Sequence, residues 1–213
     1  GVLDAAECAP TFGTPPSMVV GIIAGGAPAL VRSQEGAEDD FDAGGDAVDG
    51  RHVTAHDVVF GIAASGTTPY VRGALSRAAA HGAKTILLSC SDPPQDLLLN
   101  VDLAIQPKVG PEALTGSTRL KAGTATKLVL NTVTTGAMLR TGRAYGNLMV
   151  DLVALSDKLH DRGERIVMEV CGCDRAAARA AIAAACGHVK TAIVMQRLGV
   201  GRAPHGGVLG MLG

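Results

Sequence analysis

The sequence lacks tryptophan and has only two tyrosines and three phenylalanines among its 213 residues. Its hydrophobic core therefore has to be built from Ala, Val, Ile and Leu. No apolar run reaches the ~20 residues of a membrane-spanning helix. The net charge is −1 and no long run of basic residues is present, so the sequence lacks the positive charge that binds nucleic acid. We therefore expect neither membrane nor nucleic acid as a partner, and a cytoplasmic protein.

Signatures of metal binding and of nucleophilic catalysis are also missing. The six histidines form no HxxxH or HxH pair, and Cys171-Gly-Cys173 does not have CxxC spacing. The five cysteines are expected to be small buried side chains in a reducing compartment. The alternative of a catalytic Ser/His/Asp triad stays open, although the sequence contains no GxSxG nucleophile elbow that would support it. We expect no metal and no cofactor.

Short apolar runs alternate with helical patterns through the first two thirds of the chain. Strands are predicted at residues 18–24, 57–62, 84–90 and 101–106, and helices at 27–41, at 69–81 and after 118, with a Gly-rich loop at 42–52 and a Pro-broken connection at 91–100. This alternation is typical of βαβ units and predicts an α/β fold with a parallel sheet. A ligand is expected at the carboxyl ends of the strands.

From about Leu152 the sequence becomes Ala-rich, and a helical pattern is interrupted at Gly187. We predict two domains, residues 1–151 and a small helical region at 152–213. Residues 200–213 contain too much Gly and Pro to form a helix.

Two loops have the residues of an anion site. In the first, Ser65, Gly66, Thr67 and Thr68 precede Pro69, so that hydroxyls and backbone N–H groups meet at a helix N-terminus. An unliganded, well-capped turn explains this loop equally well. In the second, Ser117 and Thr118 are predicted to cap the next helix and to place Arg119 and Lys121 in its first turn. Because the helix dipole disfavours cations there, a bound anion is favoured.

The acidic segment 32–42 contains Glu35, Glu38, Asp39, Asp40 and Asp42. The residues alone indicate a helix end exposed to solvent, because acidic side chains are mostly found at the protein surface. Glu7 is equally unremarkable by itself.

Six segments in order carry a family resemblance: LDAAECAPTFG, GIIAGG, EGAED, GIAASGTTPY, VGPEALTGSTRLKAGTATKLVLN and YGNLMVD. Together they resemble the N-acetylmuramic acid 6-phosphate etherases, sugar-isomerase (SIS) proteins of bacterial cell-wall recycling. The resemblance implies a three-layer α/β/α domain with a helical C-terminal appendage, a homodimer, and a metal-free lyase of carbohydrate metabolism. Such a lyase converts its substrate to N-acetylglucosamine 6-phosphate and D-lactate by elimination and hydration.

The resemblance also implies roles for individual residues. Glu7 and Glu38 fall on the two catalytic glutamates, with Glu7 as proton donor and Glu38 as base. A carboxylic acid that donates a proton near pH 7 needs a raised pKa, which burial or a second carboxylate can supply. The expected substrate-binding residues are Ser65, Gly66, Thr67, Thr68, Glu112, Ser117, Thr118 and Lys121.

The chain departs from the family pattern in three places. Thr67 stands where the family usually has Arg, and the last acidic helix is lacking. The family also has a further N-terminal strand and phosphate loop before the position of Gly1, so we expect a truncated chain that is inactive alone. Three alternatives stay open: a non-catalytic regulatory SIS protein that binds sugar phosphates, an aldose–ketose isomerase, and an inert fragment.

Overall fold

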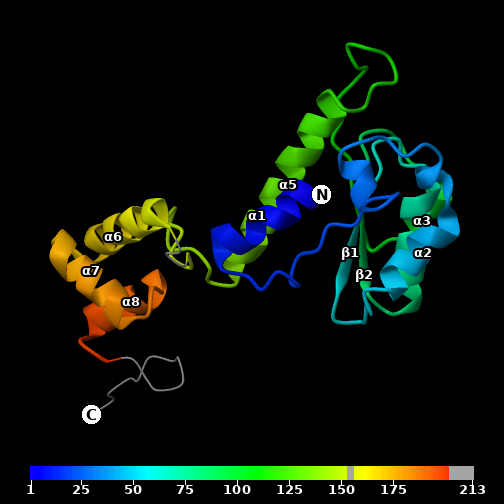
Figure 1. Ribbon diagram of the computed structural model, residues 1–213. Helices are drawn as coiled ribbons and strands as arrows, with labels where there is room; N and C mark the ends of the chain where they lie inside the picture. The colour runs from blue at the N-terminus through cyan, green and yellow to red at the C-terminus, as the bar shows by residue number, and fades with distance from the viewer. Residues whose placement is uncertain (153–155, 202–213) are drawn as a thin grey trace. The chain divides into compact units, whose positions relative to one another are not determined.

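The computed structural model describes residues 1–152 and 156–201 (Figure 1). These residues belong to two compact units. The first unit contains Gly1–Asp4 and Gly21–Thr132, and the second contains Ala5–Val20 and the chain from Val133 onward. Helices α1 (Val2–Phe12) and α5 (Lys121–Arg140) contribute residues to both. The predicted domain boundary after residue 151 stays a prediction.

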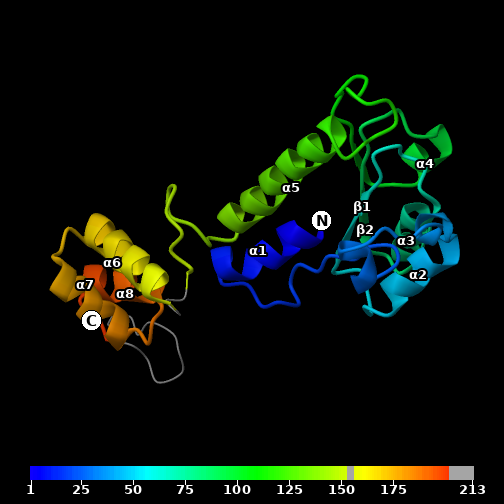
Figure 2. The ribbon, with the colours of Figure 1, turned by 45° about the horizontal axis from the view of Figure 1, so that its top comes forward.

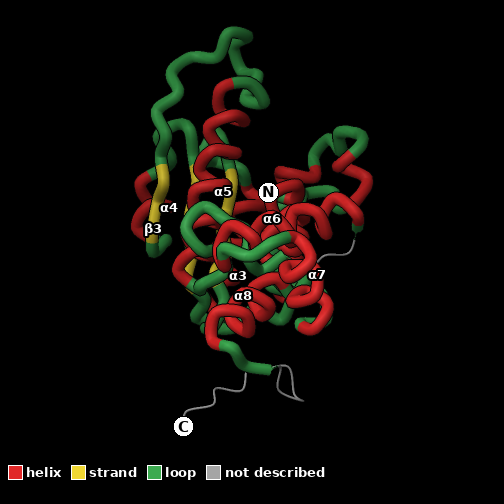
Figure 3. The backbone as a smooth tube through the Cα atoms, turned by 90° about the vertical axis from the view of Figure 1, so that its left-hand side faces the viewer, coloured by secondary structure: helices red, strands yellow, loops and turns green. Residues whose placement is uncertain are grey.

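A parallel three-stranded sheet organises the first unit. Its strands are β1 (Val58–Ile62), β2 (Lys84–Leu88) and β3 (Leu103–Ile105), in the order β1-β2-β3 (Figures 2 and 3). The register pairs Val58 with Lys84 and Leu87 with Ala104. All three strands lie within predicted apolar segments, and the expected α/β class with a parallel sheet is confirmed.

Two helices cover the sheet through one apolar cluster. Leu75 of α3 (Pro69–Ala80) and Leu97 of α4 (Gln95–Leu99) pack on Leu87 of β2. Gly61 of β1 lets α3 approach closely, because a Cβ there would lie 2.7 Å from the Val71 side chain. The connection predicted at residues 91–100 thus contains a short helix, which Leu97 anchors in the core.

The prediction for residues 27–52 was wrong. The predicted helix contains only two short 3₁₀ turns, η1 (Ala27–Leu30) and η2 (Ala37–Asp39), and helix α2 (Phe41–Asp49) occupies most of the predicted loop. Asp40 caps α2 by accepting a hydrogen bond from the Ala43 N–H. A Cβ on Gly44 of α2 would lie 1.9 Å from the Tyr70 carbonyl oxygen of α3. The glycines therefore permit close packing of two helices rather than a loop.

The strand predicted at residues 18–24 is also absent. These residues form turns and irregular chain, and Met18, Val20 and Ile22 are exposed. A strand needs a hydrogen-bonded neighbour, and among the described residues none pairs with this segment: the sheet begins at β1.

Three helices form the core of the second unit: α6 (Asp157–Cys171), α7 (Arg175–Ala184) and α8 (Val189–Leu198). Val167, Ile182 and Val189 are buried between them. Ser156 caps α6 and Asp174 caps α7, each through a side-chain oxygen. The predicted helical C-terminal region and its break at Gly187 are confirmed. The prediction for residues 200–213 lies almost entirely outside the described residues.

Candidate functional site at the carboxyl ends of the strands

The loop after β1 turns sharply at Gly66, whose φ of 75° favours glycine. A Cβ at Gly66 would lie 2.6 Å from Pro93 and 2.8 Å from the Ser89 Oγ. The Ser65 Oγ accepts hydrogen bonds from the Thr67 N–H (3.2 Å) and hydroxyl (3.0 Å). The loop is thus held by its own hydroxyls and by the neighbouring loop.

Thr68 is the N-cap of α3, as predicted, but its side chain makes no capping hydrogen bond. The first turn of α3 therefore receives no side-chain oxygen from its cap residue. Ser65 and Thr67 are exposed beside it. Backbone N–H groups at a helix N-terminus, with hydroxyls alongside, can bind a phosphate.

The loop after β2 connects the β1 loop to the start of α5. The Cys90 N–H donates to the Ala64 carbonyl (3.1 Å), and the Cys90 thiol donates to the Ala122 carbonyl (3.7 Å). Ser89 is fully buried, and its hydroxyl donates to the Ser91 carbonyl (2.8 Å). The first predicted anion loop and the start of α5, which follows the second, are therefore both connected to the loop after β2.

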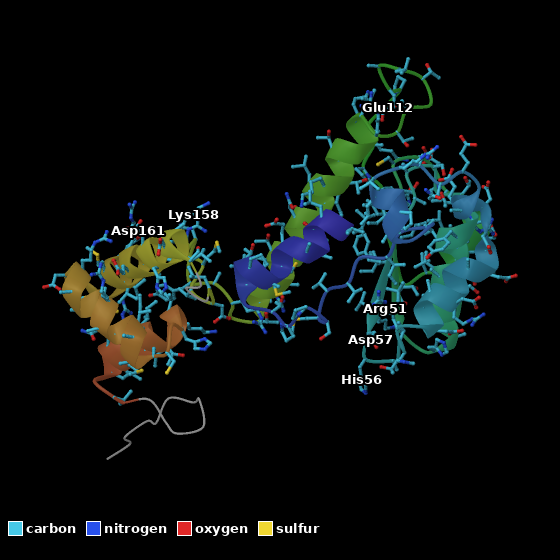
Figure 4. All side chains as sticks on the ribbon, in the orientation of Figure 1. Arg51, His56, Asp57, Glu112, Lys158 and Asp161 are labelled. Atoms are coloured by element: carbon cyan, nitrogen blue, oxygen red, sulfur yellow. The ribbon has the colours of Figure 1, made fainter. Side chains whose placement is uncertain are left out.

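Glu112 occupies the N-terminus of α5 (Figure 4). Its two carboxylate oxygens accept hydrogen bonds from the Lys121 N–H and the Ala122 N–H, each at 2.9 Å. The N–H groups of Ala122 and Lys121 favour the charged carboxylate and thereby lower the pKa of Glu112. Glu112 thus places a negative charge at this helix end, and the binding of an external anion there stays a prediction.

The prediction that Ser117 and Thr118 cap this helix was wrong. The helix begins at Lys121, after Arg119, and Glu112 supplies the cap from nine residues upstream. Thr118 instead accepts a hydrogen bond at its carbonyl from the Gly123 N–H (2.9 Å). Thr118 and Lys121 are exposed, and Ser117 is half-buried. Their binding of substrate stays a prediction.

The two predicted catalytic glutamates lie in different units. Glu7 is exposed on α1 in the second unit, and Glu38 is exposed in η2 of the first. Among the other acids of the 32–42 segment, Asp40 has a structural task as the cap of α2. Glu35, Asp39 and Asp42 are exposed.

The histidines, cysteines and acids of the described residues were candidates for a metal site. Within the described ranges, no three His, Cys, Asp or Glu side chains are arranged to hold a metal ion. Of the five cysteines, all within the described residues, only Cys8 is buried and Cys186 is exposed, so the prediction of uniformly buried thiols was wrong. No helix in the described part of the chain is long and apolar enough to span a membrane.

Sequence reasoning missed Ser89 and Cys90, which join the two loops. Both directly follow a buried strand, and small polar residues in that position were a signal that could have identified them. Glu112 was expected to touch substrate, and its capping role has no local signal. Its hydrogen-bond partners lie nine and ten residues away.

Comparisons with known proteins give two kinds of match. A family model described as the glucokinase regulatory protein N-terminal SIS domain matches residues 4–79. That range runs from α1 to α3 and includes the Ser65–Thr68 loop. The match agrees with a three-layer α/β/α domain of the SIS type.

Several curated proteins are similar over nearly the whole chain, and each is called N-acetylmuramic acid 6-phosphate etherase. The protein from Erwinia tasmaniensis is 52% identical over 98% of this chain and 70% of its own length. The protein from Thermosynechococcus vestitus is 53% identical over 92% of this chain and 63% of its own length. The protein from Rhizobium rhizogenes is 54% identical over 94% of this chain and 65% of its own length. The chain thus spans about two thirds of the length of these relatives.

Proposed function

The chain belongs to the N-acetylmuramic acid 6-phosphate etherase family, and on that premise we propose that it cleaves the lactyl ether of N-acetylmuramic acid 6-phosphate. The products are N-acetylglucosamine 6-phosphate and D-lactate, formed with net consumption of one water. The observation that carries the proposal is the 52% identity over 98% of the chain with the relative from Erwinia tasmaniensis. The enzyme is a carbon–oxygen lyase.

Two carboxyl groups suit this chemistry. In the open-chain sugar the C1 aldehyde acidifies the C2 proton, and Glu38 takes that proton as the base. As the C3–O bond breaks, Glu7 protonates the departing lactate oxygen, because a lactate alkoxide is a poor leaving group. A C2–C3 double bond remains. Water then adds at C3 and a proton returns to C2.

The phosphate and sugar are assigned to the loops at the carboxyl ends of the strands. The first turn of α3, with Ser65, Gly66, Thr67 and Thr68, supplies N–H groups and hydroxyls for the 6-phosphate. Ser117, Thr118 and the Lys121 ammonium complete the binding surface from the α5 side. Glu112 contributes by holding the start of α5, since both its oxygens already accept hydrogen bonds there. We also propose a homodimer and a cytoplasmic location.

The test is an assay of D-lactate released from N-acetylmuramic acid 6-phosphate. It uses the 213-residue chain and any longer natural form that contains it, because the chain spans about two thirds of its relatives' length. Glu7→Gln and Glu38→Gln are each expected to lower kcat by at least 10²-fold, and Glu35→Gln is the matched control. Lactate from both glutamine variants at the wild-type rate would contradict the assignment of the two glutamates.

One further observation favours a second candidate function. The SIS model that matches residues 4–79 describes a regulatory protein, so the chain could bind a sugar phosphate without catalysis. Binding of N-acetylmuramic acid 6-phosphate, measured by calorimetry, with no lactate released by any natural form, would replace the etherase proposal with this one.

A further inference from the structure

Helix α1, which carries Glu7, has no basic residue in its last turn. The last carbonyls of a helix concentrate its negative dipole end and need donors. At the end of α1 such a donor is supplied by Arg143, which lies 131 residues after Phe12 in the chain. One guanidinium nitrogen donates to the Phe12 carbonyl (2.9 Å) and to the Gly13 carbonyl (3.4 Å). Both residues and Arg143 belong to the second unit.

Asp151 holds Arg143 in place from the other side. Its carboxylate lies 3.7 Å from the Arg143 guanidinium and 3.4 Å from the Lys190 ammonium, and its side chain is only 20% exposed. Lys190 also donates to the Gly142 carbonyl (2.6 Å) at the end of α5. We call Arg143, Asp151 and Lys190 the charged node. It connects the ends of α1 and α5 with the start of α8.

The backbone confirms that this end of α1 is tightly seated. Gly13 has a φ of 61°, and a Cβ there would lie 2.5 Å from the Asp151 carbonyl oxygen. Cys8 and Phe12 of α1 are buried against Met138 of α5. The position of α1 in the second unit is therefore fixed by an apolar contact along its side and by the charged node at its end.

We propose that Arg143 is a positioning residue for Glu7. It touches no reacting atom; it fixes the axial position and tilt of α1 through the Phe12 and Gly13 carbonyls. Glu7 lies about one and a half turns before Phe12 on the same helix, with Pro10 between them. A small displacement of a proton donor costs up to about 10²-fold in rate, because proton transfer needs hydrogen-bond distance. The inference rests on the proposed function.

The test compares three variants in the 213-residue chain and in any longer natural form that contains it. Arg143→Met removes the donor and keeps the aliphatic stem, and Arg143→Lys retains one ammonium donor. Arg140→Met is the matched control, because Arg140 is exposed three residues earlier on α5. Lactate release gives kcat and KM, amide hydrogen exchange reports on residues 8–13, and the thermal midpoint reports on global stability.

We expect Arg143→Met to lower kcat about tenfold or more with KM changed less than twofold, and to speed amide exchange in residues 8–13. Arg143→Lys is expected to recover part of the loss, and Arg140→Met to match the wild type. Wild-type kcat and exchange in Arg143→Met would overturn the proposal. So would a loss of kcat accompanied by faster exchange throughout the molecule, which indicates general destabilisation.

The two proposals fail in different ways. If no wild-type form releases lactate, the proposed function is wrong, and the positioning role of Arg143 falls with it. If the wild type releases lactate and Arg143→Met does so at the same kcat, the etherase function stands and the positioning role is wrong.

Discussion

Asp102 joins the start of β3 to the start of β2 through both of its carboxylate oxygens. The Lys84 ammonium donates to one (2.6 Å), and the Thr85 N–H donates to the other (2.9 Å). The hydrogen bond from Lys84, followed by that from the Thr85 N–H, lowers the pKa of Asp102 to about 2. The charged form is therefore preferred in the folded state.

This pKa predicts how the stability of the Asp102→Asn variant depends on pH. Because the folded pKa of about 2 lies below the ordinary value of 3.8, the carboxylate stabilises the fold fully above about pH 4, and that contribution is lost as the pH falls to about 2. The thermal midpoint of the wild type should exceed that of Asp102→Asn by a constant amount from pH 7 to 5. This difference should become smaller below pH 4. Asp46→Asn, on the exposed side of α2, is the matched control for a change of surface charge. A gap that is unchanged at pH 2 would refute the ion-pair explanation.

The family resemblance assigned Glu112 to substrate binding, and that assignment stays a prediction. In the structure both its carboxylate oxygens accept backbone hydrogen bonds at the start of α5. Glu112→Ala should therefore speed amide exchange at Lys121 and Ala122 selectively, measured by NMR, whereas Glu35→Ala should not change it. Unchanged exchange at both amides would contradict the capping role.

At the level of elements, α2 and α3 approach each other through glycines on both helices. A Cβ on Gly44 would lie 1.9 Å from the Tyr70 carbonyl oxygen, and one on Gly73 would lie 1.9 Å from the Phe41 carbonyl oxygen. No side-chain rotation can relieve a contact with backbone. The helices would have to move apart.

We therefore expect Gly44→Ala and Gly73→Ala each to lower the free energy of unfolding by about 1–3 kcal/mol, as overpacking does. Gly136→Ala is the matched control. It lies within α5, where an added Cβ would meet no neighbouring atom within 4 Å, so alanine should stabilise the helix by up to about 1 kcal/mol. Denaturant titration measures all three, and equal signs for Gly73→Ala and Gly136→Ala would contradict the packing argument.

An element could be predicted from the sequence where its signal lies within its own segment. β1 and β2 were found because each is a buried apolar run, and α3 because Thr68 and Pro69 mark its start. Helix α2 was missed because Gly44 and Gly45 have low helix propensity, about 1 kcal/mol each below alanine. Contact with α3 outweighs that propensity, and the contact is invisible in the local sequence.

At the scale of the whole molecule, the two units have separate hydrophobic cores. Leu87 is fully buried in the first and Val167 in the second, and the two belong to different apolar clusters. Local stability should therefore respond separately in each unit.

Leu87→Ala should cost about 2–5 kcal/mol and Val167→Ala about 1–3 kcal/mol, from lost burial and the cavity left behind. Leu87→Ala should speed amide exchange in β1 and β2, and Val167→Ala should speed it in α6–α8. Each variant serves as the control for the other. Equal loss of protection in both units from either substitution would show a single cooperative unit instead.

The sequence by itself determined the parallel α/β class, the C-terminal helices and the family, because these follow from local periodicity and from six motifs in order. It also placed Ser65–Thr68 at a strand end. Only the tertiary structure decided that Glu112 caps α5, that α2 is a helix, and that residues 18–24 form no strand. Each of these outcomes depends on a partner outside the segment: N–H groups nine residues away, a facing helix, or a neighbouring strand.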